Sequence, residues 1–261
     1  MQLIDIGVNL TNKRLLRDVD QVVTAAGQAG VEQMVVTGTS LEHSQQALDL
    51  CARHPARLFA TAGIHPHEAS SWNAQSQQQL ATLCQAPAVR AVGETGLDFN
   101  RNYSPREAQI AAFEGQMELA AATGLPLFLH QRDALPTFVP LLGEYRDRLS
   151  RVVVHCFTDD RQALHTLLDL DCHIGVTGWV CDERRGGDLR ESIVDIPPNR
   201  LMIETDAPYL LPRDLPDPPS DKTNRPQYLP HILGRIAQLR GDDPGQLART
   251  IQRTTREFFA L

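Results

Sequence analysis

The chain has 261 residues, and 25 Lys and Arg against 32 Asp and Glu give it a formal net charge of −7 at pH 7. With 42% hydrophobic and 22% charged residues, the composition is that of a soluble globular protein, which excludes a disordered chain. No apolar run reaches the roughly 18 residues of a membrane helix, and the first residues lack the basic start of a signal peptide.

The five cysteines form no C-x-x-C pair. An odd, scattered set is typical of reduced thiols, which excludes a disulfide scaffold and predicts a cytoplasmic protein. The negative net charge argues against a broad basic surface that coats duplex nucleic acid, although it leaves room for a local basic patch.

Eight short apolar runs rich in β-branched residues predict strands. They span residues 3–8, 33–37, 58–63, 90–94, 126–130, 152–155, 173–177 and 201–205. Amphipathic stretches between or after the runs predict helices over residues 19–29, 41–53, 106–123, 159–170 and 246–259. A proline-rich segment, 207–230, is predicted to be a long loop after the last strand.

The strands recur about every 28 residues, which is the length that a strand, a helix and two turns require. Several runs are apolar throughout, as expected for strands of a parallel sheet that is buried on both faces. We therefore predict one α/β domain over residues 1–261, a (β/α)8 TIM barrel, with a doubly wound open sheet as the alternative.

Polar side chains stand at the ends of four predicted strands: Glu94, His130, His155 and Asp206. The active site of such a barrel lies at the carboxyl ends of its strands, so these side chains would meet there. One histidine at a strand end is more often an ordinary polar residue than a ligand. Two imidazoles and two carboxylates on four strands, however, have the composition of a divalent-metal site.

Seven motifs make the chain resemble the TatD family of metal-dependent deoxyribonucleases, over essentially its whole length. They are GIHPH (63–67), GETGLDF (93–99), HQRDA (130–134), HCFT (155–158), GWVCDERRG (178–186), IETDAPYLLPR (203–213) and NRPQYLPHI (224–232). The resemblance implies a TIM barrel with Mg²⁺-dependent 3′→5′ exonuclease activity on DNA and sometimes RNA. It also implies metal ligation by Glu94, His130, His155 and Asp206, and a role in DNA repair or nucleic-acid turnover.

The first strand departs from the family pattern. Many members carry a His-x-His pair where this chain has Gly7 and Asn9. We therefore expect one firmly held ion on Glu94, His130 and His155. A second, looser ion would lie between Asp206, Glu94 and Asn9. The loss of two imidazoles favours Mg²⁺, with Mn²⁺ as the alternative, over Zn²⁺.

Two residues are candidates for proton transfer. Asp206 is predicted to be the general base for the attacking water, and His65 to bind phosphate or hydrogen bond the leaving oxygen. A role for His65 in fixing its own loop beside Pro66 is the alternative. Asp98 either orders the loop after Glu94 or hydrogen bonds a ligand imidazole.

Further residues are candidates for substrate binding. Arg132 would clamp a phosphate, and Asn9 would contribute where the second ion meets substrate. Arg184 and Arg185 form the best local basic pair for a nucleic-acid backbone, which Lys222 and Arg225 could extend. The alternative for these arginines is a solvated loop. The aromatic rings of Trp179, Phe99 and Tyr209 could stack an unpaired base, which would favour single-stranded DNA.

Two other functions remain open from the sequence. A small-molecule amidohydrolase, such as a lactonase, deaminase or cyclic amidase, would use the same barrel. A binding protein descended from an enzyme would explain Gly7 and Asn9. The retained residues at the four strand ends and the basic loop favour the nuclease. The partner is then single-stranded DNA, with RNA as a further substrate, and neither a membrane nor a second subunit is expected.

Overall fold

A computed structural model describes residues 2–261. All eight strands lie in one sheet in chain order. They are β1 (Leu3–Val8), β2 (Val31–Val36), β3 (Leu58–Ala62), β4 (Val89–Asp98), β5 (Leu127–Arg132), β6 (Val152–Val154), β7 (His173–Val176) and β8 (Leu201–Ile203). The backbone amides of Asp206 and Asn9 donate to Gly7 and Ala207, at 2.9 and 2.8 Å, so the chain after β8 lies beside the end of β1. This order confirms the predicted (β/α)8 barrel. In a doubly wound open sheet, the strands would not follow one another in chain order from one edge to the other.

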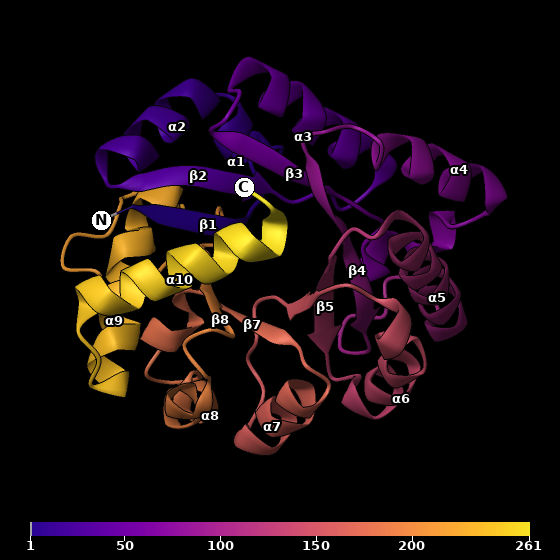
Figure 1. The fold of residues 1–261 in the computed structure, drawn as a ribbon. Helices are drawn as coiled ribbons and strands as arrows, with labels where there is room; N and C mark the ends of the chain where they lie inside the picture. Colours follow the sequence, from indigo (N-terminus) through magenta and orange to yellow (C-terminus); the bar gives the residue numbers. More distant parts are fainter. Residues whose placement is uncertain (1) are drawn as a thin grey trace. The chain divides into compact units, whose positions relative to one another are not determined.

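Helices follow most of the strands (Figure 1). The α-helices are α1 (Lys13–Leu16), α2 (Val19–Gln28), α3 (Leu41–Arg53), α4 (Ala74–Leu83), α5 (Arg106–Thr123), α6 (Leu135–Tyr145), α7 (Arg161–Asp169), α8 (Gly187–Ser192), α9 (Leu229–Arg240) and α10 (Pro244–Phe259). Short 3-10 helices are η1 (Pro66–Ser71), η2 (Arg146–Arg148), η3 (Gly178–Cys181), η4 (Ile193–Asp195) and η5 (Pro226–Tyr228). The predicted loop 207–230 therefore ends in η5 and the first turn of α9.

The chain divides into two compact units. Unit 1 consists of residues 1–36, 156–165 and 174–261, and unit 2 of residues 37–155 and 166–173. Within unit 2, β3 to β6 are parallel neighbours, α3 packs on β3 and α5 packs on β4. Within unit 1, β1 pairs with β2 and β7 with β8, and α10 packs against β1 and β8.

Strand β4 is longer than the predicted run 90–94, because it continues through the GETGLD segment to Asp98. A shift in register between Val92 and Thr95 lets residues 95–98 pair with residues 129–132 of β5. Gly93 and Gly96 have φ angles of 144° and 136°, in the region that favours glycine. The two glycines, which suggest a loop in the sequence, instead let the strand approach β5 closely.

Gly93→Ala should therefore destabilise the protein by about 2 to 4 kcal/mol, as overpacking and a strained φ combine. A Cβ at Gly93 would overlap the carbonyl oxygen of Phe128 on β5. Urea unfolding would measure the loss. Gly143→Ala is the matched control. A Cβ at this position in α6 meets open space, and alanine favours a helix more than glycine does. Equal stability changes in the two variants would contradict the close approach of β4 and β5.

Three residues that follow strands adopt the left-handed conformation without being glycine. Asp133 after β5, Cys156 after β6 and Asp206 after β8 have φ angles of 52°, 48° and 52°. A non-glycine residue in this region is strained, although aspartate tolerates it better than most residues. Each of these positions therefore turns the chain sharply where a strand ends.

Candidate metal centre

Unit 2 brings together four side chains from its four strands. His65 follows β3, Glu94 lies within β4, His130 lies within β5, and His155 follows β6. The amide of His155 donates to the Leu129 carbonyl at 2.9 Å, so its backbone continues the pairing of β6 with β5. The parallel strands therefore present the four side chains at the same end of this part of the sheet.

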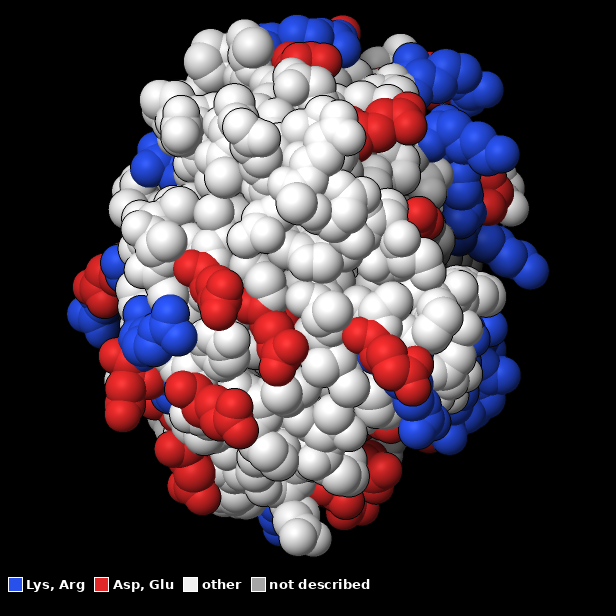
Figure 2. Space-filling view, turned by 90° about the vertical axis from the view of Figure 1, so that its right-hand side faces the viewer, with Lys and Arg blue, Asp and Glu red and all other residues white. Residues whose placement is uncertain are grey.

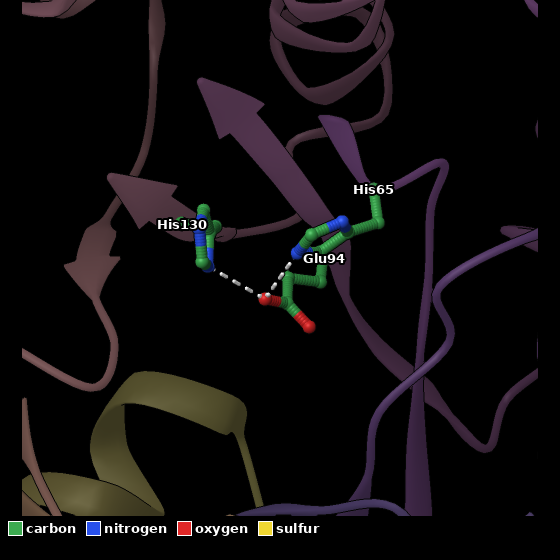
Figure 3. A group of neighbouring side chains, drawn as sticks. All are labelled: His65, Glu94 and His130. Atoms are coloured by element: carbon green, nitrogen blue, oxygen red, sulfur yellow. Dashed lines mark ion pairs between the residues drawn. The ribbon is translucent and has the colours of Figure 1, made fainter. Parts of the chain in front are cut away.

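Three imidazoles converge on one carboxylate oxygen of Glu94. Its Oε1 atom lies 2.8 Å from His155 Nε2, 3.1 Å from His130 Nδ1 and 3.2 Å from His65 Nε2. Figure 3 shows His65 and His130 approaching this oxygen from two sides. Glu94, His65 and His155 are buried, and the side chain of His130 is 19% exposed. The sequence left two roles open for His65, contact with substrate or fixing of its own loop. In the structure its Nε2 atom lies beside Glu94 Oε1, and its Nδ1 atom accepts the backbone amide of His67 at 3.0 Å.

Asp98 connects this cluster to the following loop. Its Oδ2 atom lies 2.7 Å from His67 Nε2 and 3.3 Å from His130 Nε2. Its Oδ1 atom accepts the backbone amides of Asn100 and Arg101, at 3.0 and 2.8 Å. The carboxylate therefore combines the two roles that were alternatives in the sequence, since it orders the loop and faces an imidazole of the cluster.

The cluster is electrostatically coupled. Burial alone would raise the pKa of Glu94, but the imidazoles of His155 and His65 and the hydrogen bonds from His130 and His155 outweigh it and hold this pKa well below its usual range. Burial likewise opposes the charged form of His130, yet the neighbouring carboxylates of Asp98 and Glu94 raise its pKa. For His65 burial dominates and lowers the pKa to about 4.

These residues fit a divalent cation. His65, Glu94 and His130 each offer a ligand atom, and these atoms lie within 4.8 Å of one another. The Nε2 atom of His130 is buried and makes no aligned hydrogen bond within residues 2–261. Nitrogen and carboxylate donors around one buried point are the donor set of divalent-metal sites.

A second group with ligand-type atoms, Cys181, Asp214 and His231, has a simpler explanation. His231 Nε2 lies 2.6 Å from Asp214 Oδ1, and the Arg235 guanidinium lies 3.7 Å from Asp214 Oδ2. Burial, and then the neighbouring Asp214 carboxylate, raises the pKa of the Cys181 thiol. Because a cationic side chain already faces the carboxylate, we regard this group as a link between η3 and α9.

Asp206 and Asn9 lie together in unit 1. The Asn9 side-chain amide donates to Asp206 Oδ1 at 2.9 Å, and both residues are half-buried. Glu204 precedes Asp206 by two residues and is buried. Its Oε1 atom accepts a hydrogen bond from the backbone amide of Cys156 at 2.6 Å. Glu204 therefore holds the left-handed turn that follows His155.

The DERR segment is less free than a solvated loop. Asp182 is buried, and its carboxylate lies 3.4 Å from Arg184 Nε and 3.1 Å from Arg185 Nε. The Arg185 guanidinium also lies over the Trp179 ring, 4.3 Å from its centroid. Both arginine side chains stay more than half exposed, so their charges face solvent from fixed positions.

The remaining candidates differ in their surroundings. Arg132, at the end of β5, is exposed. Arg225 pairs with Asp221 at 2.6 Å.

Figure 2 shows a face with scattered Asp and Glu, while Lys and Arg gather along its right-hand edge. Basic side chains are therefore local on that face, as the net charge of −7 leads one to expect.

The family model described as "TatD related DNase" matches residues 4–260. The chain belongs to this family. Members of the TatD family are nucleases, that is, hydrolases of phosphodiester bonds. The chain is 51% identical to "3′-5′ ssDNA/RNA exonuclease TatD" of Enterobacter lignolyticus and 49% identical to the protein of the same name from Salmonella typhimurium. Each match covers 99% of both chains.

Solved structures agree with this TatD assignment. The TatD homolog YJJV from Escherichia coli K12 is 27% identical, with a TM-score of 0.90 over 99% of this chain and 98% of that one. A hydrolase of the TatD family from Entamoeba histolytica shares the fold, with a TM-score of 0.91 at 23% identity, and covers 99% of this chain and 98% of its own. Within residues 2–261 no helix is both long and apolar enough to cross a membrane.

Proposed function

We propose that this TatD family protein is a Mg²⁺-dependent 3′→5′ exonuclease that hydrolyses DNA, with single strands preferred and RNA as a further substrate. The observation that carries the proposal is the convergence of His65, His130 and His155 on one oxygen of Glu94. The relatives named as 3′-5′ ssDNA/RNA exonucleases, at about half identity over their full length, support it. A role in DNA repair or nucleic-acid turnover, in the cytoplasm and as a monomer, follows as part of the proposal.

The ion would be held by Glu94, His130 and His155, with His65 at the same carboxylate oxygen. When bound, a divalent ion lowers the pKa of water and polarises a phosphoryl oxygen. Asp98 orients the His130 ring from its other edge, as carboxylates commonly do for imidazole ligands. A second, looser ion would involve Asp206, Glu94 and Asn9, and metal analysis that finds two tightly held zinc ions per chain would contradict this arrangement.

Asp206 is the proposed general base. The oxygen of the attacking water forms a bond to phosphorus while its proton passes to the Asp206 carboxylate. The bond between phosphorus and the 3′ oxygen of the shortened strand breaks, and that oxygen takes a proton from solvent water, while Asp206 returns its proton to solvent. The hydrogen bond from Asn9 fixes the orientation of Asp206 for this step. Arg132, Arg184 and Arg185 would bind phosphates along the strand.

The decisive experiment follows single-stranded DNA labelled at the 5′ or the 3′ end. With Mg²⁺ we expect the 3′ label to be released first and the 5′-labelled strand to shorten as a ladder. EDTA should lower the rate by about a hundred-fold or more, because charge neutralisation at phosphorus is lost. Asp206→Asn should lower kcat far more than it changes KM. Loss of the 5′ label first, or hydrolysis of lactones without any cleavage of DNA, would contradict the proposal.

A further inference from the structure

The described side chain with the largest exposure among the large apolar residues is Tyr103, at 68%. It stands on the loop between β4 and α5, where its ring lies edge-on to His67 with centroids 4.7 Å apart. Single exposed apolar residues are common and need no function. The position and the rigidity of this loop therefore decide what the ring does.

Tyr103 is two ring contacts from the candidate metal centre, all within unit 2. The centroid of the His67 ring lies 4.3 Å from that of His65. The Nε2 atom of His65 in turn lies 3.2 Å from Glu94 Oε1. A phosphodiester held at Glu94 would thus have one of its two neighbouring bases within reach of the tyrosine ring.

The loop that carries Tyr103 is fixed on both sides of the ring. Before it, Asp98 accepts the amides of Asn100 and Arg101. After it, the Ser104 hydroxyl donates to the His67 carbonyl at 2.9 Å and accepts the amide of Ser70 at 3.1 Å. An aromatic ring that is exposed and yet held in place loses little entropy when a ligand packs on it.

Three arginines stand on or beside the loop, together with the exposed Glu107 at the start of α5. Arg101, Arg106 and Arg132 are exposed, and the Arg106 guanidinium lies over the Phe99 ring, 4.3 Å from its centroid. The Phe99 amide donates to the Arg132 carbonyl at 2.9 Å, which places Arg132 beside the same loop. Asp133, which accepts a hydrogen bond from the side-chain amide of Asn100, is a carboxylate next to them. An exposed aromatic ring among cationic side chains is the chemistry that binds single-stranded nucleic acid.

We propose that Tyr103 is the stacking surface for a nucleobase next to the phosphodiester that the Glu94 cluster holds. This inference rests on the proposed nuclease function and assigns a base subsite to it. Stacking accepts every base, so the subsite should not discriminate between nucleotide sequences. It requires an unpaired base, so it favours single strands and frayed ends. Of the three aromatic residues expected from the sequence, Phe99 and Trp179 pack against arginines, at 4.3 Å each, and the Tyr209 hydroxyl accepts the side-chain amide of Asn12 at 3.0 Å.

The kinetic test compares Tyr103→Leu with Tyr103→Phe on a 5′-labelled DNA strand with Mg²⁺. We expect Tyr103→Leu to lower kcat/KM about ten-fold, mainly through KM, because one stacked base is lost. Tyr103→Phe should keep most of the activity. The control is Tyr145→Leu, an aromatic change at the far end of α6 that should leave the rate unchanged.

The same assay on strands with an abasic nucleotide on either side of the scissile bond separates stacking from structure. One abasic position should slow the wild type about ten-fold and have little further effect on Tyr103→Leu. Equal rates for the wild type and Tyr103→Leu on the natural strand would overturn the inference. So would a loss in Tyr103→Leu that is the same on natural and abasic strands.

A binding measurement separates failure of this inference from failure of the proposed function. A strand with 2-aminopurine near its 3′ end is titrated with protein in EDTA, so that no cleavage is needed. Stacking on Tyr103 should quench its fluorescence in the wild type and in Tyr103→Phe but not in Tyr103→Leu. Quenching without any cleavage in Mg²⁺ would overturn the nuclease and keep the base site. Cleavage with quenching that is unaffected by Tyr103→Leu would overturn the base site alone.

Discussion

Glu94→Gln should lower the nuclease rate about a thousand-fold or more, because it removes the charge on which three imidazoles converge. Glutamine keeps the size of the side chain, so the packing of β4 against β5 is preserved. Its amide oxygen accepts hydrogen bonds more weakly and carries no negative charge to face His155, His130 and His65. Steady-state rates on single-stranded DNA would measure the effect on activity.

The same variant should lose the stabilisation that metal gives. A ligand that binds only the folded state adds about 2.7 kcal/mol at a hundred times its Kd, so Mn²⁺ should raise the Tm of the wild type. Glu94→Gln should show little or no rise. Glu107→Gln, an exposed substitution of the same kind in the first turn of α5, is the control and should behave as the wild type. A metal-dependent rise in Tm that survives in Glu94→Gln would place the ion elsewhere.

Asp5→Asn should raise the free energy of unfolding above pH 7 and change this free energy little at pH 4. Asp5 is fully buried in β1, and desolvation raises its pKa to about 7, against the hydrogen bonds from Thr205 and Gly7. The folded protein therefore still binds a proton that the unfolded chain releases near the ordinary aspartate pKa of 3.8. It follows that wild-type stability falls as pH rises between these two values, by up to about 4 kcal/mol.

The Asp5→Asn substitution removes this loss of stability at high pH and keeps the hydrogen bonds of the side chain. Its carbonyl oxygen can accept the amides of Gly7 and Thr205, and its NH₂ group can donate to the Thr205 hydroxyl, which now lies 2.5 Å from Asp5 Oδ2. We expect a gain of about 2 to 4 kcal/mol at pH 8 in urea unfolding. Asp147→Asn, an exposed control, should show no such change with pH. A difference between Asp5→Asn and wild type that is the same at pH 4 and pH 8 would contradict the assignment.

The fold followed from the sequence because its strands and helices alternate with regular spacing. Apolar runs give the positions of the strands, and β4 shows where this signal ends. Glu94 stands between two glycines, Gly93 and Gly96, and the segment after it reads as a loop, yet residues 95–98 pair with β5. Only the register of β5, a contact that is distant in sequence, makes these glycines part of a strand.

The candidate site was predictable at the level of strand ends, and less so at the level of partners. Glu94, His130 and His155 were expected near one another, and the structure places them there. His65 also ends a strand segment, so the same signal could have placed it on Glu94. Tyr103 carries no signal of its own, because its exposure depends on turns that Asp98, Ser104 and Gln109 make through hydrogen bonds.

The left-handed residues after β5, β6 and β8 lower the stability of the fold, and one of them is the proposed general base. Asp133, Cys156 and Asp206 each hold a backbone conformation that costs a non-glycine residue about 1 kcal/mol or more. Glycine would relieve that cost, but at position 206 it would also remove the proposed base. Laboratory evolution for heat resistance alone would thus be drawn towards glycine at a residue that the reaction needs. A thermostable version of this enzyme is better sought in the helices, away from the carboxyl ends of the strands.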